Sequence, residues 1–198
     1  MWYYFKQTLF LFVYMLFMSF ISFAIAALKI PALKVILLIL SIALYVFIAV
    51  MSSFKEGQQS VSLLNSNDLQ RKRIIETGED IKLKTAGEYR VWKGFFLGFL
   101  VTLPLVICLI VHTIIAYTGG GNGAGAVAGM GYALFYIPYS TFLETAVLES
   151  AGQYYILLYC VPFMMATCGI PYLLGARKMQ AKYDKIQEKH NELYGDKA

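Results

Sequence analysis

The chain has 198 residues, of which 59% are hydrophobic and 15% are charged, and its formal net charge is +5. Soluble domains are nearer half apolar and a quarter charged, so this composition argues against an ordinary soluble protein and indicates a membrane protein. The positive charge does not indicate nucleic-acid binding, because the cations flank hydrophobic segments, where they set topology and meet anionic lipid headgroups.

The three cysteines lie inside apolar segments, and no two of them have CxxC spacing. This pattern predicts buried thiols rather than a disulfide framework or a closed zinc site. The sequence contains no GxSxG, HExxH, EF-hand, P-loop or dinucleotide-binding motif. We therefore expect no metal and no cofactor, and a non-enzymatic role is favoured over an enzymatic one.

Two long uncharged runs begin the chain, at residues 7–28 and 35–54. At a rise of about 1.5 Å per residue, each is long enough as a helix to cross a hydrocarbon core about 30 Å thick. Pro31 lies in the break between them and disfavours helix at the residue before it, so an antiparallel helical hairpin is expected. A cleaved signal peptide is the alternative for the first run, since Ala24-Ile25-Ala26 has the form of a cleavage site, but the run exceeds the usual h-region of about 7–15 residues.

A long polar loop, residues 55–93, separates these runs from the rest of the chain. Asn67 or Asp68 is expected to cap a short helix within it, because both side chains can accept a hydrogen bond from a free backbone N–H. Gly78 is expected to end that helix, since glycine adopts the left-handed conformation at a helix C-terminus.

The end of the loop carries a second signal for the start of a helix. Thr85 and Glu88 have the spacing of a capping box, which predicts that the helix of the third span begins there. Arg90, Trp92 and Lys93 follow and are expected to mark the membrane surface, with the cations snorkelling and the indole at the headgroups.

The fifty residues 94–143 contain no Asp, Glu, Lys or Arg, and two arrangements fit them. Either a span at 94–117 precedes a glycine-rich external segment, or a further span occupies about 123–143. The distribution of cations favours the first arrangement. The 55–93 loop and the tail, residues 176–198, are both rich in Lys and Arg, so both should be cytoplasmic. An even number of crossings must then separate them.

A last span at 154–175 completes that even number, which leaves residues 118–153 outside. The sequence therefore predicts an all-α fold in which residues 1–198 form a single domain. It is a polytopic protein of the cell membrane, with four transmembrane helices and both termini cytoplasmic.

Glycines recur every four residues in two places, which predicts smooth faces for close helix packing. The external segment is re-entrant, lies at the membrane interface or contains a fifth span at 123–143, and the sequence leaves these alternatives open. The residues concerned are Gly94 and Gly98 in the third span and Gly121, Gly125 and Gly129 in the external segment.

Two basic clusters are expected to contact lipid headgroups or a partner protein, with a solvated helix face as the alternative. One lies in the polar loop, and the other begins the tail, which has the pattern of an amphipathic helix. They comprise Arg71, Lys72, Arg73, Arg177 and Lys178.

An ionisable residue also lies inside the third span. His112 falls on the same helical stripe as the span's glycines, so it is expected to point into the bundle, and an intramembrane ionisable group marks a candidate functional site. Glu144 and Glu149 are the acids of the external segment and could form a polar pathway with it. A neutral histidine bonded to a neighbouring helix, with Glu144 capping its own helix, is the structural alternative.

Catalytic polar groups are scarce, whereas glycine faces and the tail offer packing surfaces. We therefore expect a non-enzymatic accessory, scaffold or assembly subunit that binds partners within the membrane and at its cytoplasmic face. Its partners would be the lipid bilayer and either another protein or a second copy of the chain. The alternative is a small ion or solute transporter or channel subunit that uses His112 with Glu144 or Glu149, and a membrane enzyme using the same residues comes third.

Overall fold

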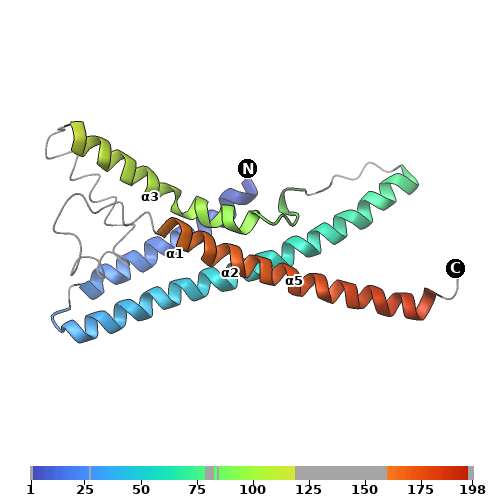
Figure 1. The fold of residues 1–198 in the computed structure, drawn as a ribbon, viewed down its shortest axis with the longest axis horizontal. Coiled ribbons are helices and arrows are strands. Elements are labelled where there is room, and N and C mark those ends of the chain that lie inside the picture. Colours follow the sequence, from blue (N-terminus) through green and yellow to red (C-terminus); the bar gives the residue numbers. More distant parts are fainter. Residues whose placement is uncertain (1, 27, 79–82, 84, 119–159, 196–198) are drawn as a thin grey trace.

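The computed structural model is all-α, which confirms the predicted class, and it describes residues 2–26, 28–78, 83, 85–118 and 160–195. Within these residues there are four long helices and one short 3₁₀ turn (Figure 1). The elements are α1 (Trp2–Ala26), α2 (Pro31–Thr77), η1 (Thr85–Gly87), α3 (Lys93–Thr118) and α5 (Cys160–Tyr194).

The second helix is much longer than the sequence predicts. It runs for 47 residues without a break, so the expected boundary after residue 54 and the separate short helix capped by Asn67 or Asp68 are wrong. The reason is that no proline follows Pro31 in this stretch, so each backbone N–H keeps its partner four residues back. The predicted end is confirmed, because Gly78 has φ 70° and its N–H donates to the carbonyl of Ile74 at 2.9 Å.

The capping-box prediction is also wrong. Thr85 begins a single 3₁₀ turn, in which the Glu88 N–H donates to the Thr85 carbonyl at 3.2 Å, and α3 starts only at Lys93. The Glu88 carboxylate is engaged elsewhere, with Asn67 and Arg71 of α2. The helix expected in the tail is confirmed, and it is continuous with the apolar segment before it, because α5 runs from Cys160 to Tyr194.

The bundle has a core to which all four helices contribute. α5 packs along α2 and α3, and α1 packs against the same two helices. The buried apolar cluster draws on each helix and comprises Leu11, Met15, Met18, Tyr45, Ala49, Val101, Met164 and Cys168.

Helix α5 approaches α2 so closely that only glycine fits at the contact. A Cβ on Gly57 would overlap the carbonyl oxygen of Tyr172, and a Cβ on Gly175 would overlap the carbonyl oxygen of Phe54. On its other side α5 meets α3, where a Cβ on Gly98 would lie 2.5 Å from the carbonyl oxygen of Met164. Such contacts let helix backbones pack against each other directly.

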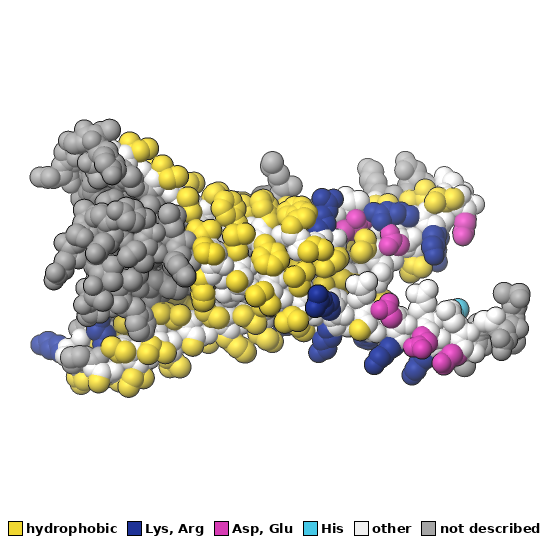
Figure 2. Space-filling view, viewed as in Figure 1, with side chains coloured by type: hydrophobic (Ala, Val, Ile, Leu, Met, Phe, Trp, Pro, Cys, Tyr) yellow, Lys and Arg dark blue, Asp and Glu magenta, His cyan; other side chains and the backbone are white. Residues whose placement is uncertain are grey.

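The surface divides into an apolar part and a charged part. Figure 2 shows a broad hydrophobic surface over the region where the helices lie together, with cations along one edge and side chains of both charges beyond it. Large apolar side chains of α1 and α2 are more than half exposed, among them Phe20, Ile36, Leu40 and Phe47. An exposed apolar area of this kind marks an interaction surface for lipid or protein.

Within the described residues, one helical stretch is long and apolar enough to cross a membrane, the 46 residues Ala32–Thr77. Shorter apolar stretches lie at Tyr4–Met18 and Lys93–Pro104. The structure therefore shows one candidate span, and the four-span topology stays a prediction.

The glycine contact gives a direct test of the packing. Gly57→Ala should destabilise the bundle by about 1–3 kcal/mol, because the added methyl forces α2 and α5 apart. We expect a lower melting temperature for the full-length protein in detergent. Gly195→Ala is the matched control, since a Cβ there meets nothing within 4 Å. Equal melting of the two variants would show that the close approach contributes nothing.

Candidate functional site

The most unusual feature of the described structure is a lysine with no solvent exposure. Lys93, the first residue of α3, is 0% exposed. Its Nζ donates to Ser60 Oγ at 2.9 Å and to the Gly87 carbonyl at 3.0 Å, and it lies 3.1 Å from Glu56 Oε1. An ammonium has three protons to donate, and three acceptors surround this one.

The partner carboxylate is equally buried. Glu56 is 3% exposed, and its Oε1 also accepts from Ser60 Oγ, one turn further along α2, at 3.3 Å. Its Oε2 accepts from Gln7 Nε2 of α1. The ion pair therefore ties together α1, α2, α3 and the turn that precedes α3.

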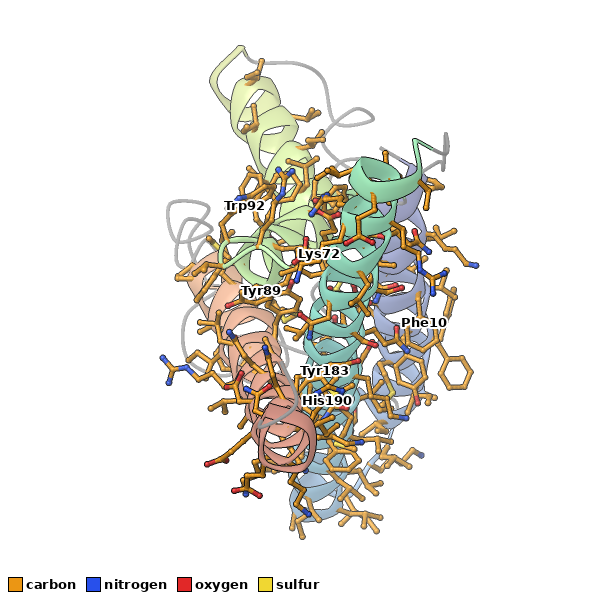
Figure 3. All side chains as sticks on the ribbon, turned by 90° about the vertical axis from the view of Figure 1, so that its right-hand side faces the viewer. Phe10, Lys72, Tyr89, Trp92, Tyr183 and His190 are labelled. Atoms are coloured by element: carbon orange, nitrogen blue, oxygen red, sulfur yellow. The ribbon has the colours of Figure 1, made fainter. Side chains whose placement is uncertain are left out.

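The fourth helix closes the network with an aromatic ring. Tyr172 of α5 is 0% exposed, and its ring centroid lies 6.0 Å from Lys93 Nζ, within the range of a cation–π contact. Its hydroxyl accepts from the Arg90 N–H at 3.5 Å, and its ring stacks on Tyr89 at 5.8 Å between centroids. Figure 3 labels Tyr89, which comes from the segment between η1 and α3.

The charged residues and the glycine contacts occupy the same place. Glu56 precedes Gly57 in α2 and Lys93 precedes Gly94 in α3, and both glycines face Tyr172. The absence of side chains at these glycines lets the Tyr172 backbone and ring approach both helices, which seals the ion pair from solvent. Burying a charge costs several kcal/mol, so the pair tolerates burial only because it is hydrogen-bonded.

The segment leading into α3 is fastened along α2 by a second set of polar contacts. The Glu88 carboxylate accepts from Asn67 Nδ2 at 2.7 Å and from Arg71 Nη2 at 2.6 Å. The Tyr89 N–H donates to the Ser60 carbonyl at 3.1 Å. The chain therefore reaches Lys93 along a fixed path, which positions the ammonium.

The hydroxyl, ammonium, carboxylate and amide of this network are paired with one another. Among the residues that the structure describes, no three His, Cys, Asp or Glu side chains are placed to hold a metal ion. What the network can do is fix the register of four helices.

The three residues of the predicted polar pathway have no described side chains. His112 belongs to α3, but its side chain lies outside the described part of the structure, and Glu144 and Glu149 lie outside it altogether. Gly121, Gly125 and Gly129 are also outside the described residues.

The remaining predicted residues are all placed. Gly94 and Gly98 lie against α5. Arg71 is held in ion pairs with Asp68 and Glu88, both at 2.6 Å. The other four basic residues are exposed, and Lys178 Nζ lies 5.7 Å from the centroid of the Phe54 ring; these four are Lys72, Arg73, Arg177 and Lys178.

The buried pair is absent from the sequence prediction, which places Lys93 at the membrane surface. The expected snorkelling of its side chain is wrong, because the ammonium turns inward to Glu56, whereas its level in the membrane stays a prediction. The sequence features that could have indicated a buried polar cluster are polar residues at helical spacing beside long apolar runs. Glu56 and Ser60 lie four residues apart, and Gln7 lies at the start of an uncharged run.

We predict that Lys93→Met lowers stability by about 3–5 kcal/mol, because it leaves the Glu56 carboxylate buried without its cation. At about 2–4 °C per kcal/mol, the melting temperature in detergent should fall by roughly 10 °C. The double variant Lys93→Met, Glu56→Met should recover most of this loss, since neither charge remains.

The exposed pair provides the control for this experiment. Asp68→Asn removes a partner of Arg71 at a position where both side chains are solvated, at 40% and 52% exposed, and should cost about 0–1 kcal/mol. A Lys93→Met melting temperature as high as that of Asp68→Asn would contradict the assigned role of the buried pair.

Comparison of the chain with protein-family models, with curated proteins and with solved structures finds no match.

Proposed function

We propose that the protein is a non-enzymatic membrane scaffold, an accessory or assembly subunit that holds a partner protein at the cytoplasmic face. One observation carries the proposal: α2 and α5 both continue beyond the apolar bundle as unbroken helices and diverge (Figure 1). We call residues 62–77 the α2 arm and residues 177–194 the α5 arm.

The two arms meet near their base and then separate. Ser62 Oγ of the α2 arm and the Tyr183 hydroxyl of the α5 arm are hydrogen-bonded at 3.1 Å, and Figure 3 places Tyr183 between the two helices. Further out, apolar side chains stand exposed among charged ones: Leu69 is 65% exposed, Ile75 83% and Ile186 53%. Helices with isolated exposed anchors of this kind dock into grooves of other proteins.

The arrangement of the helix ends supports the predicted topology. The start of α1, the start of α3 and both arms lie toward one end of the bundle, and the α1–α2 turn lies at the other (Figure 1). Exposed cations follow the apolar part at the arm end, including Lys55, Arg177 and Lys178. This is the cation-rich side that the positive-inside rule assigns to the cytoplasm, with four spans and both termini inside.

Cysteine labelling tests the sidedness. In a background without the three native cysteines, Lys72→Cys should resist a membrane-impermeant maleimide in intact cells and react after permeabilisation. Asn122→Cys should react in intact cells. The opposite labelling pattern would overturn the proposed topology.

The role of the arms can be tested with paired substitutions. Ile75→Ala with Ile186→Ala should weaken partner binding roughly tenfold or more, because each removes an exposed anchor worth about 1 kcal/mol or more. The measurement is crosslinking in cells followed by co-purification, with light scattering to detect a second copy of the chain.

The matched control is Thr77→Ala with Gln187→Ala, at exposed polar positions beside the two isoleucines. If the isoleucine variant recovers as much crosslinked partner as this control, the arms do not bind through these anchors. A wild-type chain that crosslinks to nothing and remains monomeric would refute the scaffold proposal.

A further inference from the structure

An apolar groove lies between α1 and α3, separate from the buried ion pair. Its volume is about 520 Å³, within the range of about 300–1,000 Å³ typical of small-molecule sites. Its walls are formed by Tyr4, Phe5, Thr8, Leu9, Phe12, Phe96, Leu100, Leu103 and Pro104.

The lining of the groove offers few hydrogen-bonding groups to water. Seven of the nine side chains are pure hydrocarbon. The Thr8 hydroxyl donates to the Tyr4 carbonyl at 2.7 Å, so its proton is already used within α1. Water gains too few hydrogen bonds in a space of this kind to be favoured there. The chemistry of the walls therefore suits a hydrocarbon chain.

One end of the groove is aromatic. Tyr4 stacks on Trp92 at 6.4 Å between centroids and meets the edge of Phe96 at 5.8 Å, and Trp92 meets Phe96 edge-on at 5.4 Å. Figure 3 shows Trp92 beside α3. Tyrosine and tryptophan prefer the level of the lipid headgroups, so this end marks where a hydrocarbon chain would give way to its polar head.

Two exposed cations neighbour this end along the chain: Lys6 follows Phe5 in α1, and Arg90 lies two residues before Trp92. Glu56 and Glu88 are paired with Lys93 and Arg71, so they do not offset these cations.

We propose that this groove binds one anionic phospholipid, with an acyl chain between α1 and α3 and its phosphate at Lys6 and Arg90. The site rests on the proposed membrane location and adds a ligand that the scaffold role does not require. Hydrocarbon walls suit an acyl chain, an aromatic rim suits the level of the headgroups, and the exposed cations that neighbour the rim in the sequence suit a phosphate.

Native mass spectrometry of the full-length protein tests the site. The protein is released from detergent micelles doped with phosphatidylglycerol or with phosphatidylcholine of the same acyl chains. We expect one retained phosphatidylglycerol per chain, and less retained phosphatidylcholine. Leu100→Trp fills the groove and should lower retention roughly tenfold. Leu9→Trp, at a wall position already 44% exposed, provides a second variant that disturbs the fold less.

Two controls separate groove and charge from general effects. Ile36→Trp adds the same ring to α2 at a position 62% exposed and outside the groove, and should retain lipid as the wild type does. Lys6→Gln with Arg90→Gln should lower phosphatidylglycerol retention to the level of phosphatidylcholine, whereas Lys29→Gln, an exposed cation at the other end of the bundle, should not.

The proposal is overturned if the wild type retains no phospholipid, if it does not distinguish the two lipids, or if both tryptophan variants retain lipid as Ile36→Trp does. A dimer lost on filling the groove would assign the groove to a second copy instead. Alkaline carbonate extraction of membranes separates the two proposals: a chain that stays in the membrane but retains no lipid contradicts only the lipid site, whereas a chain that is extracted contradicts the membrane scaffold as well.

Discussion

The burial of the Lys93 ammonium against Glu56 is the constraint on which the described bundle depends. Two charges taken out of water must find every partner within the protein, and here those partners come from α1, α2, the Gly87 carbonyl and each other. Sliding of α1, α2 or α3 would leave a buried charge without one of its hydrogen bonds. The pair therefore selects one register among the many that an apolar bundle would otherwise allow.

The close packing of α5 serves the same constraint. Gly57 and Gly94 each follow one member of the ion pair, and Tyr172 covers both. A larger residue at either position would hold α5 away and admit solvent to the charges. The ion pair that specifies the helix register and the glycines that allow close helix packing therefore lie at one site. Backbone contact and electrostatics reinforce each other there.

Much of the fold could be predicted from local patterns, and the failures share one physical cause. The all-α class and the end of α2 at Gly78 follow from apolar length and from glycine's access to the left-handed region. The capping box fails because Glu88 meets Asn67 and Arg71, which are close only after folding. The expected snorkelling of Lys93 fails likewise, since the direction of its side chain is set by Glu56, 37 positions earlier in the sequence.

The unbroken course of α2 has a mechanical consequence. Its 47 residues form one rod about 70 Å long, from the turn at Pro31 to the arm that carries Ile75. The rod contains no interior proline at which it could hinge. Because the helix is continuous, a displacement of Ile75 at its outer end is carried along the backbone toward the segment that holds Glu56 and Ser60.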